Sequence, residues 1–368
     1  MFTPWQVGNL LVPVPFASCH CHTMNLHLTS PHGAPPLTAA QLSRRQLLLS
    51  GACALPSLGL GFAAPASAQS GNTVLWSGFP AGGLGDQVSR PLIERLRGRW
   101  PGSWVHDSKP GAGGRIAAEH VKRAAPDGGT LLQTPSSVVT IYPHIYPKLP
   151  YNPLTDFVPV TPLCSYAISF TAGPGLPAEI RSVAEYLKWA RENPAKASYG
   201  IPAAGSALHF GGMLLARASG VALNNVPYRG GAPLLQDLLG GQVPVSFNVV
   251  SEVQPHVKSG RLRSLAVTSP QRWPSLPDVP TMAELGYKDI NIVEFLGWYA
   301  PAGTPADFVT RLNAAVAEAV ASPEMVAVLD KVGLQALALA PADFGRLVRT
   351  EHERWAGLVK ATGFKAEE

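Results

Sequence analysis

Two short corners in the sequence could bring backbone N–H groups to a small anion. Phe79-Pro80-Ala81-Gly82-Gly83 and Pro202-Ala203-Ala204-Gly205 share a Pro-Ala-x-Gly pattern, and each lies between an apolar run and a helical pattern. Glycine lets the backbone approach a ligand closely, and a helix start presents free N–H groups with a partial positive charge. Two such corners facing each other would clamp an anion. The alternative is an ordinary strand-to-helix joint.

Ser206 and His209 are three residues apart at a helix start and could mimic the Ser–His pair of a hydrolase. The simpler interpretation is that Ser206 caps the helix while His209 faces ligand or solvent. The sequence contains no G-x-S-x-G elbow, no H-E-x-x-H, no P-loop and no C-x-x-C. We therefore predict no catalytic residues, no metal site and no cofactor.

Apolar runs alternate with helical periodicity along the chain after residue 72. Strands alternating with helices predict an α/β fold with mainly parallel sheets, whose ligands bind at the carboxyl ends of the strands. Helices are predicted near 116–125, 179–192, 208–218, 234–239, 305–321, 323–331 and 341–362. Thr304-Pro305-Ala306-Asp307 reads as a helix start with a hydroxyl cap, proline at the first position and an acid at the third. Trp298 and Tyr299, beside Glu294, are expected in the core.

Composition excludes several classes of protein. Of the 368 residues 46% are hydrophobic and only 14% charged, which excludes a disordered tail or a coiled coil. The net charge is +5 without any run of five basic residues, so no nucleic-acid partner is expected.

The N-terminal region has the pattern of an export signal. Arg44-Arg45 precedes an apolar stretch that ends in the small residues Ala66-Ser67-Ala68. We predict a twin-arginine signal over residues 1–68, cleaved near Ala68, and a periplasmic mature protein. The general secretion route and a start at Met24 stay open. Of the four cysteines only Cys164 would remain, so no intramolecular disulfide is expected.

Several motifs, in order, resemble the Bug (TctC-like) family of extracytoplasmic solute receptors of tripartite tricarboxylate transporters. They include Phe79-Pro80-Ala81-Gly82-Gly83 with Asp86, Lys109-Pro110-Gly111-Ala112-Gly113-Gly114, Val226-Pro227-Tyr228-Arg229-Gly230, Leu276-Pro277-Asp278-Val279-Pro280-Thr281 and Ala300-Pro301-Ala302-Gly303-Thr304-Pro305. The resemblance covers essentially all of 72–362. It implies a two-lobed periplasmic binding protein of type II-like architecture. Lobe 1 would hold 69–170 plus 292–368, lobe 2 would hold 171–291, and the ligand cleft would lie between them.

The same resemblance implies a small carboxylate ligand, with membrane permease subunits as candidate partners and a monomeric receptor. The implied ligand-binding positions are Phe79, Pro80, Ala81, Gly82, Gly83, Ser136, Ser137, Ala204, Gly205, Ser206, His209 and Asn248. The family often has Asp where this chain has Asn248, which puts recognition of a ligand amino group by that residue in doubt. The alternatives are a ligand-sensing receptor for a signalling partner and, less simply, a secreted hydrolase.

Overall fold

The computed structural model describes residues 71–366, so the export signal predicted for residues 1–68 lies outside the described part. The strands are β1 (Thr73–Ser77), β2 (Trp104–Ser108), β3 (Thr130–Pro135), β4 (Phe157–Ala172), β5 (Ser198–Ile201), β6 (Asn224–Pro227), β7 (Val245–Val249), β8 (Arg263–Val267), β9 (Val293–Pro301) and β10 (Gln335–Ala336). The α-helices are α1 (Leu84–Leu96), α2 (Arg115–Lys122), α3 (Ser136–Thr140), α4 (Tyr142–Ile145), α5 (Val183–Glu192), α6 (Ala207–Ser219), α7 (Gly231–Leu239), α8 (Val250–Lys258), α9 (Ala306–Ala321), α10 (Pro323–Lys331) and α11 (Pro341–Thr362). Two 3-10 turns cover Ala112–Gly114 and Pro194–Lys196.

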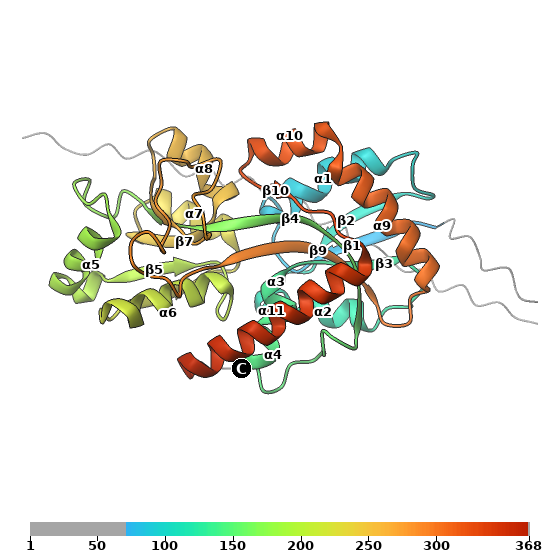
Figure 1. Cartoon of the computed structure of the whole chain (residues 1–368), viewed down its shortest axis with the longest axis horizontal. Helices are drawn as coiled ribbons and strands as arrows, with labels where there is room; N and C mark the ends of the chain where they lie inside the picture. Colours follow the sequence, from blue (N-terminus) through green and yellow to red (C-terminus); the bar gives the residue numbers. More distant parts are fainter. Residues whose placement is uncertain (1–70, 367–368) are drawn as a thin grey trace, which may run out of the picture. The chain divides into compact units, whose positions relative to one another are not determined.

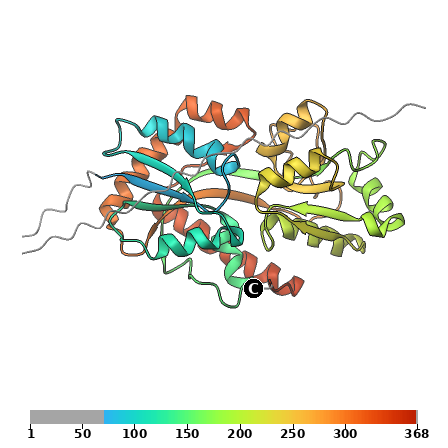
Figure 2. The ribbon, with the colours of Figure 1, turned by 180° about the vertical axis from the view of Figure 1, so that it is seen from behind.

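The strands are joined in the order β2-β1-β3-β9-β4-β7-β5-β6, with β8 and β10 also paired to β4. Strand β1 is parallel to β2 and β3, and β5 is parallel to β6 and β7. Strands β4 and β9, the long green and orange strands in Figure 1, make only antiparallel pairs in the described part of the chain. Figure 2 shows the same arrangement from behind. The predicted α/β class is confirmed, whereas the alternating pattern did not reveal this antiparallel centre.

Strand β4 pairs with β9 along its first part and with β7 and β8 along its last. Its register against β9 shifts near Pro159 and again near Pro162. Proline has no N–H for the ladder, so irregular pairing at these positions is expected. The sixteen residues are mostly buried, and Phe170 stacks on Phe247 of β7 with ring centroids 4.8 Å apart. Strand β4 therefore joins two groups of strands, since it pairs with β9 along its first part and with β7 and β8 along its last.

Three predicted helix boundaries needed correction. Helix α5 begins at Val183 rather than Glu179, because Ser182 and Glu185 form a capping box there. The helix predicted over 116–125 is α2, which ends at Lys122. The predicted hydroxyl cap at Thr304 is wrong, since Pro305 takes the N-cap position and Thr304 Oγ1 donates to the carbonyl of Pro301 at 2.8 Å. The remaining helices near 208–218, 234–239, 305–321, 323–331 and 341–362 are present with small shifts in their ends.

Trp298 and Tyr299 are buried in β9, as expected. Cys164 is a buried free thiol in β4, and the other three cysteines lie outside the described residues. Within residues 71–366 no single helix is both long and apolar enough to cross a membrane; α9 and α10 reach that length only as a pair bent by 65°.

Candidate functional site

A pocket lies where β1, β3, β5 and β7 end, at the carboxyl edge that an α/β sheet uses for ligands. We call it the glutamate pocket, because Glu252 and Glu294 are the charged side chains that line it. Its walls are Ser77, Phe79, Pro80, Gly83, Leu84, Gly85, Gln133, Pro135, Ser137, Tyr142, Tyr166, Pro202, Ala203, Ser206, Leu208, Gly231, Ala232, Val249, Glu252, Glu294 and Leu296. The cavity volume is about 80 Å³ and most of the lining is apolar.

The first corner brings the start of α1 to this pocket. Gly83 is the N-cap of α1 and supplies no side-chain cap, so the first N–H groups of the helix have no partner from a cap. The loop is held by Asp86, whose carboxylate accepts from the N–H of Gly82 and from Arg90 Nε at 3.0 Å. His106 Nδ1 lies 2.9 Å from the same carboxylate. Asp86 thus positions the loop, and the uncapped start of α1 can receive an anion.

The second corner is already satisfied by the protein itself. Ser206 caps α6 by accepting from the N–H of His209 at 3.4 Å, and its hydroxyl donates to the carbonyl of Ala203 at 2.8 Å. The next helical N–H, of Ala207, donates to Ser137 Oγ at 3.0 Å. The capping role predicted for Ser206 is confirmed, and the start of α6 has fewer free donors than the start of α1.

His209 is a buried, neutral side chain. Its Nδ1 accepts from the N–H of Gly205 at 3.1 Å, and Gly205 has a φ of +75° that glycine adopts without strain. Burial lowers the pKa of His209 to about 4, so the ring carries no charge near neutral pH. No hydrogen bond joins the Ser206 hydroxyl to this ring within the described chain. The Ser–His geometry of a hydrolase is therefore not formed.

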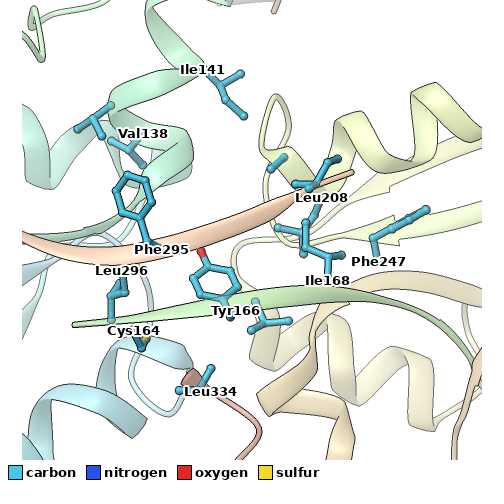
Figure 3. Close-up of a cluster of buried hydrophobic side chains, with 14 of the residues drawn as sticks. Val138, Ile141, Cys164, Tyr166, Ile168, Leu208, Phe247, Phe295, Leu296 and Leu334 are labelled. Atoms are coloured by element: carbon cyan, nitrogen blue, oxygen red, sulfur yellow. The ribbon is translucent and has the colours of Figure 1, made fainter. Parts of the chain in front are cut away.

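Ser136 and Ser137 direct their hydroxyls to Glu294 of β9. Glu294 Oε1 accepts from Ser136 Oγ and from the N–H of Ser137, each at 2.9 Å, and also from the Ser137 hydroxyl. Tyr166 of β4 donates to Oε2 at 3.3 Å, and Figure 3 shows the Tyr166 hydroxyl directed at β9. Burial raises the pKa of Glu294, and these hydrogen bonds oppose the rise. Each oxygen of Glu294 therefore has a protein donor.

Glu252, in the first turn of α8, has no comparable partners. Its Oε2 is shielded from solvent and accepts no hydrogen bond from any residue in 71–366. Burial raises the pKa of Glu252 to about 7. A Cβ added at Gly83 would lie 3.7 Å from Glu252 Oε1, and one added at Gly231 would collide with the carboxylate. Glycines at the starts of α1 and α7 therefore leave space for this side chain.

A second pocket adjoins the first and shares Phe79, Pro80, Pro202 and Ala203 with it. We call it the arginine pocket, because Arg115 and Arg229 line it; its cavity volume is about 780 Å³. The Arg115 guanidinium lies 3.7 Å from the ring centroid of Tyr146, and Arg115 Nε donates to the carbonyl of Ala112 at 3.0 Å. Arg229 is exposed. Basic side chains therefore stand beside the acidic pocket but not inside it.

The predicted site residues are divided among several places. Phe79, Pro80, Gly83, Ser137 and Ser206 line the glutamate pocket, and Ala204 lines the arginine pocket. Ala81, Gly82, Ser136, Gly205, His209 and Asn248 line neither. Asn248 is fully buried in β7, where its Oδ1 accepts from the hydroxyl of Ser246.

Sequence reasoning missed Gln133, Glu252 and Glu294 as pocket residues. A usable signal existed for the two glutamates. Glu294 interrupts the apolar run Ile292-Val293-Glu294-Phe295-Leu296, and Glu252 follows Ser251 in the mostly apolar segment Val249-Val250-Ser251-Glu252-Val253. Glutamate is almost never buried without a partner, so such a position points to a site.

The fold, with a pocket at its strand ends, matches that of solved periplasmic binding proteins. A family model described as tripartite tricarboxylate transporter family receptor, TctC, matches residues 88–364. The chain belongs to this family, whose members are periplasmic binding proteins.

Individual relatives agree with this assignment. The chain is 36% identical to a UPF0065 protein from the tcbD-tcbE intergenic region of Pseudomonas sp. (strain P51), over 76% of this chain and 83% of that protein. Among solved structures it is similar to Rpa4515 of R. palustris with adipate, at 31% identity and a TM-score of 0.77, over 81% of this chain and 99% of that one. It is also similar to the periplasmic binding protein BugD, at 32% identity and a TM-score of 0.75, with the same coverage.

Proposed function

We propose that this protein captures a small organic carboxylate in the periplasm and delivers it to the membrane subunits of a tripartite tricarboxylate-type transporter. The observation that carries the proposal is the uncapped N-terminus of α1 at the glutamate pocket. Family membership and the adipate held by a structural relative support the same ligand class.

The chemistry of recognition follows from two sets of donors. The free N–H groups and the dipole at the start of α1 favour a carboxylate. The Nε2 of Gln133, which lines the pocket, has no hydrogen-bond partner in the described chain and can donate to a carboxylate oxygen. The apolar walls suit a short hydrocarbon chain.

We infer that the predicted lobes, 69–170 plus 292–368 and 171–291, both contribute to binding. Support comes from the pocket lining, since Gly83, Ser137 and Glu294 belong to the first set of residues while Ser206 and Glu252 belong to the second. We also propose that residues 1–68 are removed on export. A receptor function needs no catalytic group, and the separation of Ser206 from the His209 ring supports a receptor over a hydrolase.

The test is a ligand screen on the mature chain, residues 69–368. Mono- and dicarboxylates of four to eight carbons, sugars and divalent metal ions are compared by thermal shift, and hits are titrated by calorimetry. Ligand at about 100 times its Kd stabilises the folded state by about 2.7 kcal/mol. For a mature chain of 300 residues, with an unfolding entropy of about 2.1 cal/mol/K per residue, we expect a rise in Tm of roughly 4 °C. A shift with sugars or metals and with none of the carboxylates would overturn the proposal.

A further inference from the structure

Glu252 is a carboxylate that faces a pocket without a partner. It lines the glutamate pocket between the starts of α1 and α7, and its Oε2 is hidden from solvent without a hydrogen bond from residues 71–366. A buried polar group without a partner costs free energy, and a buried charge costs more. The described chain leaves this hydrogen-bonding capacity unused, so a bound donor can serve as the partner of the carboxylate.

The surroundings of Glu252 make a second acid an unfavourable neighbour. No Lys, Arg or His side chain lines the glutamate pocket in the described chain. The other acid of the pocket, Glu294, already accepts hydrogen bonds from Ser136, Ser137 and Tyr166. Glu294 therefore adds negative character to the pocket. The groups that donate to it are not free to donate to an anion placed next to Glu252.

We propose that Glu252 binds an ammonium group of the ligand, so that the receptor takes an amino-substituted carboxylate in preference to a plain mono- or dicarboxylate. The inference rests on the proposed function, because it keeps the ligand carboxylate at the start of α1. An ammonium group donates charge-assisted hydrogen bonds to a carboxylate, and such bonds are about twice as strong as neutral ones. The same small pocket thus offers donors to one end of a zwitterion and an acceptor to the other.

The presence of an acid at position 252 also has a simpler explanation, and the experiment must distinguish that explanation from ligand binding. An acid in the first turn of a helix interacts favourably with the helix dipole wherever its side chain points. Glu324 occupies the first turn of α10 in the same way, but it is exposed. Glu324→Gln is therefore a control that removes the same charge from the first turn of another helix, at a residue that lines neither the glutamate pocket nor the arginine pocket.

The test compares ligands of equal chain length on the mature protein. At pH 8, calorimetry compares 6-aminohexanoate, norleucine, hexanoate and adipate, and then the four-carbon counterparts 4-aminobutanoate, 2-aminobutanoate, butanoate and succinate. We expect one amino isomer to bind at least tenfold more tightly than the monoacid and the diacid of equal length. Glu252→Gln should weaken that binding at least tenfold and leave monoacid binding equal or tighter, because a negative charge beside the acid is removed, while Glu324→Gln changes neither.

The outcomes distinguish the inference from the function on which it rests. If the diacid or monoacid binds as tightly as both amino isomers, or if Glu252→Gln keeps the amino preference, the inference is wrong and the carboxylate receptor stands. If no compound of either class binds, and the wider carboxylate screen is also negative, both are wrong. Glu252→Ala, with folding checked by circular dichroism, guards against an effect peculiar to the glutamine side chain.

Discussion

At the scale of single residues, the two pocket glutamates show how one side-chain type takes two roles. Glu294 accepts hydrogen bonds from Ser136, Ser137 and Tyr166 and so belongs to the protein's own polar network. Glu252 has an Oε2 that accepts no hydrogen bond from residues 71–366. The hydroxyls of Ser136 and Ser137, which were predicted to bind the ligand, therefore donate hydrogen bonds to Glu294.

The raised pKa of Glu252 predicts a dependence of stability on pH. In the folded protein its pKa is about 7, against 4.5 as the ordinary value. Between these values the folded state binds the proton more tightly, so its contribution to stability is full below about pH 4.5 and declines as pH rises to 7. At 1.36 kcal/mol per pKa unit the decline is about 3 kcal/mol.

We therefore expect Glu252→Gln to remove this part of the pH dependence. The measurement is urea unfolding of the wild type, Glu252→Gln and Glu324→Gln at pH 5 and pH 8. The wild type and the Glu324 control should lose stability together between these pH values, and Glu252→Gln should lose about 2.5 kcal/mol less. Equal losses in all three proteins would show that Glu252 is not ionising in a buried environment.

At the scale of elements, the first corner is proposed to bind the ligand through backbone atoms, so added bulk should matter more than lost side chains. Gly83 has a φ of −83°, which valine tolerates, and its Cβ would point 3.7 Å from Glu252 Oε1. Gly82 has a φ of +89°, which strains a branched residue. Substitutions at Gly83 and at Gly82 therefore distinguish the effect of crowding the pocket from the effect of straining the loop.

We expect Gly83→Val to lower affinity at least tenfold, equivalent to about 1.4 kcal/mol, while stability stays near the wild type. Gly82→Val should lower both affinity and Tm. Gly357→Val, at an exposed position of α11 with nothing within 4 Å, is the control for the substitution itself. Calorimetry and thermal melts measure both properties. Unchanged affinity in both loop variants, with folding confirmed, would mean that the first corner is not the binding site.

At the scale of the whole molecule, the proposed receptor function depends on the predicted export. The twin arginines lie outside the described residues, and their role stays a prediction. Changing Arg44 and Arg45 to Lys should leave the precursor in the cytoplasm, because the twin-arginine route reads that pair. Cell fractionation measures the distribution. Changing the exposed Arg97 and Arg99 to Lys is the matched control and should leave export unchanged. Normal periplasmic recovery of the signal variant would contradict the twin-arginine prediction.

Local signals in the sequence were enough for the class of fold, for most helices and for the family. Prolines or serines stand at the starts of the helices 306–321, 323–331 and 341–362. The periodicity within one helix depends only on neighbours along the chain. The cap of α6 by Ser206 was predictable for the same reason. Even local rules failed at Thr304, where a nearby carbonyl competed for the hydroxyl.

The chemistry of the pocket was decided by tertiary structure. Ser136 and Glu294 are 158 residues apart and meet only because β9 pairs with β3 and β4. Glu252 faces the glutamate pocket only because α8 follows β7 at the same strand edge as α1 and α7. A sequence determines which residues are acidic or apolar, whereas the partners of a carboxylate, and hence its charge and its ligand, depend on contacts between distant segments.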